Sequence, residues 1–175
     1  AGHDAGAVYF VRGPLEGNLS LANADSKLLS AWDGAVVGAV TGDGFGELLV
    51  VGASTYLVYG PVDGGTLPVG DAGDVELVGE GVAPSPSAAD AGDVDGDGLH
   101  DLLVASNGSA YLLYGPVDGT VALVSADVTL LEPSQGITAV AGGGDVDGDG
   151  LDDLLCVGGA PARPIWSSRT SSDGC

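Results

Sequence analysis

The sequence predicts an all-β protein assembled from a repeated unit of about fifty residues, and three observations lead to this prediction. Similar segments return at 7–30, 55–80 and 110–134, each with an aliphatic run, a Gly-Pro pair and a second apolar run. The phrase GDVDGDGLHDLLV at 92–104 returns as GDVDGDGLDDLLC at 144–156. No stretch shows the apolar spacing of a helix, whereas 32 glycines and 9 prolines mark many turns.

Each unit contains four short runs rich in Val, Leu and Tyr and bounded by Gly, Pro, Asp and Ser, which is typical of strands. In chain order they are the run before the acidic loop (35–40, 138–141), the run after it (47–52, 101–105, 153–157), the Tyr-rich run and the run after Gly-Pro. Consecutive apolar positions, as in YLVYG and DLLV, indicate strands buried on both faces. A repeating four-stranded unit of this length predicts a β-propeller with antiparallel blades.

Composition narrows the classes of function. The chain has 25 acidic and 4 basic side chains, a net charge of -21, which repels nucleic acids and anionic membrane surfaces. Its hydrophobic fraction of 45% is enough to bury a core. No apolar run reaches the roughly 20 residues of a membrane span, so we expect no membrane insertion.

Two acidic loops carry the ligand spacing of a calcium site. Positions 1, 3, 5 and 9 are aspartates in both, position 6 is glycine, and position 7 is a leucine whose backbone carbonyl is a further expected ligand. The predicted ligands are Asp93, Asp95, Asp97, Leu99 and Asp101 in the first loop, and Asp145, Asp147, Asp149, Leu151 and Asp153 in the second. Calcium takes six to eight oxygen ligands, and a loop coiled around it presents every second side chain inward. The spacing predicts two Ca²⁺ sites per chain, and the alternative is a pair of solvated turns that bind nothing.

The 39–47 loop keeps the turn and loses the charge cluster. Ala39, Thr41 and Glu47 stand where the complete loops have aspartate, and only Asp43 matches. We expect no calcium in this loop. The two complete loops differ from a helical EF-hand, because their position 12 is Val104 or Cys156 where that motif needs a bidentate glutamate.

These residues resemble the FG-GAP repeats of integrin α-subunit propellers and their bacterial relatives. DVDGDGLHD and DVDGDGLDD match the calcium motif of that family, and DLLV and YLVYG match its strand pattern, over about residues 5–160. The resemblance implies a calcium loop between the first and second strands of a blade. It also implies a non-catalytic module for interaction or adhesion, extracellular or at the cell surface.

The resemblance divides residues 1–160 into about three blades per chain, where the family has seven. Residues 7–30 and 137–158 are expected half-blades, 34–80 and 86–131 are expected whole blades, and 161–175 form a non-repeat tail. Because propellers typically have four to eight blades, we expect the half-blades of separate chains to complete each other. A homodimer closing a six-bladed ring is the favoured arrangement, and a fragment of a larger propeller protein is the alternative.

The remaining chemistry-bearing residues favour no enzyme. His3 lies near the first residue, His100 is expected as an exposed loop side chain, and Cys156 and Cys175 are expected as free thiols or one bridge. The aromatic candidates for a glycan site are Trp32, Tyr56, Tyr59, Tyr111 and Tyr114. The equivalent repeat positions of the tyrosines favour packing, so a lectin-type propeller stays an alternative to a protein-binding module.

Overall fold

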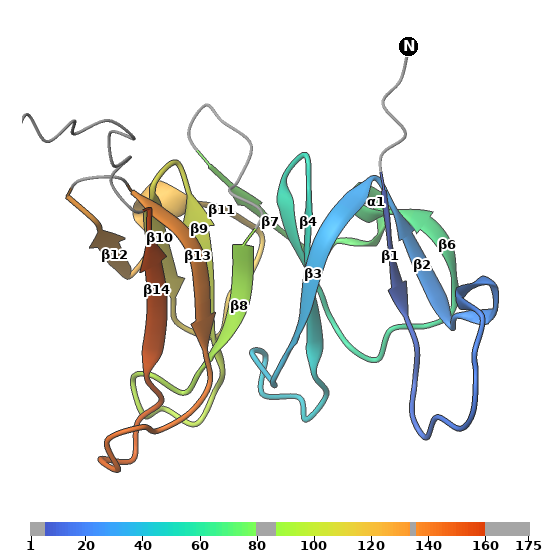
Figure 1. Ribbon diagram of the computed structural model, residues 1–175, viewed down its shortest axis with the longest axis horizontal. Helices are drawn as coiled ribbons and strands as arrows, with labels where there is room; N and C mark the ends of the chain where they lie inside the picture. The colour runs from blue at the N-terminus through green and yellow to red at the C-terminus, as the bar shows by residue number, and fades with distance from the viewer. Residues whose placement is uncertain (1–5, 80–86, 134–135, 160–175) are drawn as a thin grey trace, which may run out of the picture.

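The computed structural model describes residues 6–79, 87–133 and 136–159, and its strands lie in four sheets (Figure 1). One central sheet has the order β12-β10-β9-β8, in which every neighbouring pair is antiparallel. Its strands are β8 (Ser87–Gly92), β9 (Asp101–Ser106), β10 (Ser109–Leu113) and β12 (Val128–Leu131). All of β9 is buried, as its run of consecutive apolar residues predicts. Asn107 and Gly108, both with positive φ, turn the chain from β9 to β10, because a two-residue hairpin needs that conformation.

The other central sheet repeats this pattern and receives one strand from further along the chain. Its antiparallel strands are β3 (Ala31–Val37), β4 (Glu47–Gly52), β5 (Thr55–Val58) and β7 (Val75–Val78), and β4 is entirely buried. The added strand β11 (Thr120–Ala122) runs parallel to β7 on the outside. Since β11 belongs to the chain segment of the next sheet, it links the two central sheets.

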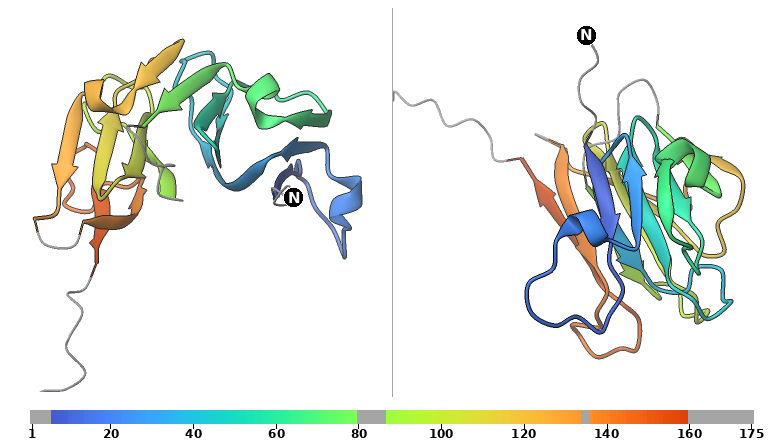
Figure 2. Two further views of the ribbon diagram at one scale, coloured as in Figure 1. Left: turned by 90° about the horizontal axis from the view of Figure 1, so that it is seen from above. Right: turned by 90° about the vertical axis from the view of Figure 1, so that its right-hand side faces the viewer.

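Two smaller sheets lie at the ends. One contains β1 (Ala7–Phe10) and β2 (Ser26–Leu29), with β6 (Gly65–Pro68) parallel to β2. The other contains β13 (Ile137–Gly142) and β14 (Leu154–Gly158) as an antiparallel pair. The four sheets follow one another along an open arc, with β1–β2 at one end and β13–β14 at the other (Figure 2, left).

The segment after each Gly-Pro pair differs from the single strand that the sequence predicts. After the second and third pairs it forms a short outer strand, then one helical turn, then the last strand of its own sheet, whereas after the first pair the helical turn comes without an outer strand. The turns are η1 (Leu21–Asn23), α1 (Val69–Ala72) and η2 (Leu123–Ser125), and all three Gly-Pro peptide bonds are cis. The chain has to reach the neighbouring sheet and return, and Val69 and Leu123, both buried, hold the second and third turns in place. No helix in the described residues is long and apolar enough to cross a membrane.

The core lies between neighbouring sheets. The largest apolar cluster joins the two central sheets through Leu49, Leu57 and Leu77 on one side and Leu102 and Val104 on the other. Two smaller clusters join each end sheet to its central neighbour. The all-β prediction is confirmed, with sheets packed face to face. The predicted tail at 161–175, with Cys175, and His3 lie outside the described residues.

Candidate metal loops

The three loops of the repeat join the first and second strands of successive sheets. The 39–47 loop follows β3, the 93–101 loop follows β8 and the 145–153 loop follows β13, and all three lie at the lower edge of the molecule in Figure 1. Asp101 and Glu47 are the first residues of β9 and β4, and Asp153 directly precedes β14. The loops therefore connect strands on both sides, as their sequence predicts.

The 93–101 loop brings its first three aspartates together. One carboxylate oxygen from each of Asp93, Asp95 and Asp97 lies within 4.8 Å of the others. Backbone amides coil the loop: Gly96 N and Gly98 N donate to the two oxygens of Asp93 at 2.7 and 3.0 Å. Positive φ values at Gly96 and Gly98 (82° and 89°) make this path accessible to glycine and costly for other residues.

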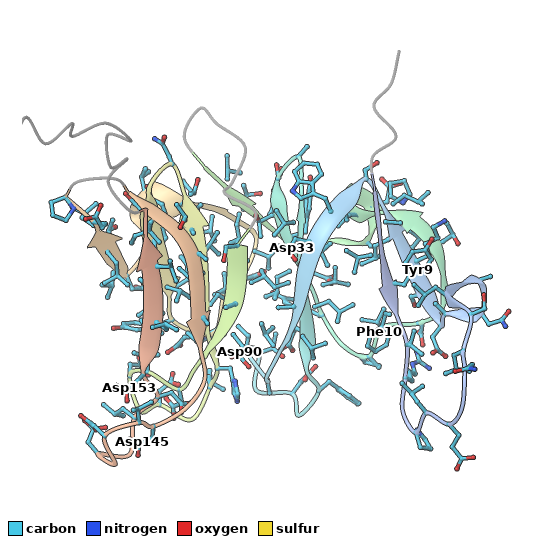
Figure 3. The ribbon with its side chains drawn as sticks, in the orientation of Figure 1. Tyr9, Phe10, Asp33, Asp90, Asp145 and Asp153 are labelled. Atoms are coloured by element: carbon cyan, nitrogen blue, oxygen red, sulfur yellow. The ribbon has the colours of Figure 1, made fainter. Side chains whose placement is uncertain are left out.

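The 145–153 loop has the same construction. Oxygens of Asp145, Asp147 and Asp149 lie within 4.8 Å of one another, and Gly148 N and Gly150 N donate to Asp145 at 2.6 and 2.9 Å. These bonds hold the pKa of Asp145 below its usual range, and the bond from Gly150 N contributes most. The carboxylate is therefore stabilised as an anion. The loop lies at one end of the molecule, where Figure 3 labels Asp145 and Asp153.

The position-9 aspartates lie outside these three-carboxylate clusters. Asp101 is fully buried, and its two oxygens accept hydrogen bonds from Val94 N at 2.9 Å and Gly115 N at 3.0 Å. Burial raises the pKa of Asp101, although the two backbone bonds oppose the shift. Asp153 is exposed and accepts one bond, from Val146 N at 2.8 Å. Each position-9 carboxylate thus ties the start of its loop to the strand that follows.

The 39–47 loop is held by hydrogen bonds to Glu47 and Asp43, without a cluster of carboxylates. Glu47 is buried and accepts bonds from Val40 N at 2.8 Å and from the Thr41 hydroxyl at 3.0 Å. Asp43 accepts a bond from Phe45 N at 2.8 Å, as Asp97 and Asp149 do from Leu99 and Leu151. The same turn is therefore built with one aspartate, and this loop is an internal control for the other two.

The loops also contact one another, which the sequence pattern did not reveal. At position 8, His100 N donates to Ala39 O at 3.3 Å and Asp152 N donates to Asp93 O at 3.0 Å. The leucine at position 7 packs on the position-4 glycine of the preceding loop: a Cβ on Gly42 would lie 2.9 Å from Leu99, and one on Gly96 would lie 3.0 Å from Leu151.

His100 has a larger role than that of an exposed loop side chain. Its ring lies over Gly38, where a Cβ would meet Nδ1 at 2.2 Å, and Nδ1 lies 2.9 Å from a carboxylate oxygen of Asp90. The other oxygen of Asp90 accepts a bond from Gly38 N at 3.0 Å. This network joins β8 to the end of β3. Gly38 lies 52 positions before Asp90, so no local motif could have indicated that the two residues meet.

The aromatic candidates for a glycan site do not form one group. Tyr59 and Tyr111 pack against the largest apolar cluster, and Tyr56 and Tyr114 pack against the two smaller ones. The Tyr59 hydroxyl also donates to Val117 O at 2.7 Å. Trp32 is 49% exposed. The structure thus uses the tyrosines for packing, as their repeat positions predict.

Comparison with known families gave a match that includes both complete loops. Residues 93–156 match the model of the FG-GAP-like repeat. The chain carries an FG-GAP repeat. The match runs from the first aspartate of one complete loop to the strand after the other, so it covers a full period of the repeat and confirms the resemblance predicted from these motifs. Comparison with curated proteins gave no match.

Proposed function

We propose that this FG-GAP chain is a calcium-binding, non-catalytic propeller module that serves interaction or adhesion outside the cell. The observation that carries the proposal is the pair of three-carboxylate clusters, built by the same hydrogen bonds in two successive loops. FG-GAP repeats occur in propeller modules of this kind. The proposed ligands are the side chains at positions 1, 3, 5 and 9 and the backbone carbonyl at position 7 of each loop.

The chemistry of the donors selects the cation. Three carboxylates within 4.8 Å repel one another, and a divalent cation among them replaces this repulsion with attraction. All proposed donors are oxygens, which suit hard cations and not zinc or copper. Calcium tolerates a flexible, irregular set of six to eight oxygens, whereas magnesium requires near-octahedral geometry. A coiled, exposed loop therefore fits calcium better than magnesium.

The proposed location follows from the same chemistry. Extracellular calcium modules work at dissociation constants of about 10⁻⁴ to 10⁻³ M, and free calcium in the cytosol is too scarce to fill such sites. The two clusters lie in exposed loops, which is typical of weak sites. We therefore place the chain outside the cell or at its surface. Calcium there holds the loops rigid, so that the edge of the molecule presents a fixed surface to a protein or glycan partner.

The protein-binding function is favoured over the lectin alternative. A sugar-stacking face needs exposed aromatic rings near one another, and the structure uses the four candidate tyrosines in packing. Of the five aromatic candidates, Trp32 is the one with close to half of its surface exposed. The other alternative, a purely structural fragment of a larger propeller protein, differs from our proposal because it needs no binding partner.

Calorimetric titration of calcium into chelator-treated protein tests the proposal. We expect two sites per chain, and weaker binding at one of them in each of Asp95→Asn and Asp147→Asn, because an asparagine oxygen still binds calcium but carries no charge. Each of these aspartates accepts one backbone bond, from Asp97 N and Asp149 N, which an asparagine oxygen retains while the charge is lost. The matched control is Asp43→Asn, which should keep both sites. No heat at millimolar calcium, or two sites of unchanged affinity in Asp95→Asn, would contradict the proposal.

A further inference from the structure

Successive sheets are joined on their outer side by contacts that recur at equivalent positions. A short strand from one segment lies parallel to the last strand of the preceding sheet, as β6 does on β2 and β11 does on β7. The residues before the first two Gly-Pro pairs also donate to the carbonyl after the next pair: the Arg12 guanidinium to Val62 O, and the Tyr59 hydroxyl to Val117 O. On the inner side, the loop contacts described above join the two central sheets to each other and the second of them along the chain to the β13–β14 sheet.

The outer contacts are interrupted between the two ends of the chain. Tyr114 precedes the third Gly-Pro pair, as Arg12 and Tyr59 precede the others, and Leu15 follows the first pair, as Val62 and Val117 follow theirs. Residues 18–20 are the counterpart of β11 by their distance from Gly-Pro, yet they lie in none of the described sheets. Leu19 is 58% exposed, and Leu131 on β12, the strand without an added neighbour, is 74% exposed.

The inner contacts are interrupted in the same way. Phe45 occupies the position of Leu99 and Leu151 and is 51% exposed, because no described glycine of a preceding loop lies under it. Gly148 occupies the position of Gly42 and Gly96, which those leucines cover, and no described side chain lies within 4 Å of a Cβ built on it. Each interrupted contact thus has its two halves at opposite ends of one chain.

The end sheets show the same complementarity in their strands. Within the described residues, β14 pairs with β13 alone and β1 pairs with β2 alone. The pair β13–β14 corresponds to the first two strands of a central sheet, and β1–β2 corresponds to the last two. An apolar cleft between β1 and β3–β4 is lined by Val8, Phe10, Val36, Leu48 and Val50, and Val36 is 67% exposed. On the other end, Leu155 of β14 is 63% exposed.

We propose that the β13–β14 hairpin of one copy enters the cleft between β1 and β3 of a second copy, where β14 pairs with β1. The new sheet then has four antiparallel strands. Two copies that each give and receive a hairpin close a ring of six sheets. A second copy is the occupant because one joint restores every interrupted contact: β14 with β1, residues 18–20 with β12, Tyr114 with Leu15, and Phe45 with Gly148.

The central sheets define the register of the new pair. In the β9–β10 pair Leu103 lies opposite Leu112 and Val104 lies opposite Tyr111, and β4–β5 has the same register at the equivalent residues. Counting from the loop and from Gly-Pro, Leu155 lies opposite Phe10 and Cys156 lies opposite Tyr9 of the second copy. Tyr9 and Phe10 lie on β1, at the far end of the molecule from Asp145 and Asp153 (Figure 3), so this pairing joins different copies.

Disulfide trapping tests this register in the full chain. Directly opposite residues of antiparallel strands have Cα atoms about 4.5–5.5 Å apart, within the range of a disulfide. In a Cys175→Ser background, Tyr9→Cys should form a disulfide with Cys156 of the second copy under mild oxidation. We expect a reducible dimer, with more than tenfold less product for the matched control Phe10→Cys, whose side chain points to the other face.

Two further measurements test the dimer without any cysteine variant. Light scattering of the unmodified chain should give twice its mass of 17.0 kDa. Leu155→Lys should give a monomer that retains its circular dichroism spectrum, since it charges the exposed edge strand. A monomeric unmodified chain, equal trapping of Phe10→Cys, or a ladder of oligomers beyond the dimer would overturn the proposal. The contrast in trapping between Tyr9→Cys and Phe10→Cys reports on strand register, and we expect it both with calcium and in chelator.

Discussion

Asp101 shows at the scale of one residue how the loops are closed. Its buried carboxylate accepts two backbone bonds, one from Val94 N at the start of its own loop and one from Gly115 N near the Gly-Pro turn. An amide side chain has one acceptor oxygen, so Asp101→Asn places an NH₂ donor against a backbone N–H. A buried donor left without a partner costs about 1–3 kcal/mol. We expect Asp101→Asn to lower the free energy of unfolding by this amount, as measured by urea denaturation in chelator.

Asp153→Asn is the matched control for that measurement. Asp153 holds the same position in its loop, but it is exposed and accepts one bond, which the asparagine oxygen retains. Its loss of stability in chelator should be smaller than that of Asp101→Asn. Equal stability of wild type and Asp101→Asn would show that the buried carboxylate does not hold its loop.

At the scale of an element, the three loops share the same turn and differ in the number of aspartates that they carry. Replacing Asp93 or Asp145 by Ala removes a proposed calcium ligand, whereas Asp43→Ala changes a loop that closes through Glu47. In millimolar calcium we expect the first two variants to lower Tm by several degrees and Asp43→Ala to lower it less. Wild type and Asp43→Ala should also gain Tm on calcium addition, because a ligand that binds the folded state stabilises it. Scanning calorimetry with and without chelator measures both effects.

Other elements show which part of the architecture the sequence predicts. The strands β4 and β9 are evident from consecutive apolar residues, and the acidic loops from alternating aspartates. The outer strands β6 and β11 escaped prediction, because they are three or four residues long, mostly exposed, and paired with strands of another unit. A local pattern carries no signal for such a pairing. The same holds for the contact of His100 with Gly38, which depends on the packing of two sheets.

At the scale of the whole molecule, the loops and the proposed ring depend on each other. In the ring, the 145–153 loop of one copy lies beside the 39–47 loop of the other, with Phe45 over Gly148. This joint combines the loop that lacks the charge cluster with one that has it. Calcium at the proposed 145–153 site would therefore fix the surface on which Phe45 packs in the proposed ring, and its removal would leave three mutually repelling carboxylates there.

Chelation should accordingly weaken the dimer without breaking the strand pairing outright. We expect the dimer dissociation constant to rise at least tenfold in chelator, measured by analytical ultracentrifugation over a dilution series. Asp147→Asn should give a tighter dimer than wild type in chelator, since it removes one charge from the cluster, whereas Asp95→Asn, whose loop packs within its own chain, should leave it unchanged. A dimer dissociation constant that is equal with and without calcium would show that the ring does not depend on calcium binding. The metal would then act on the loops alone.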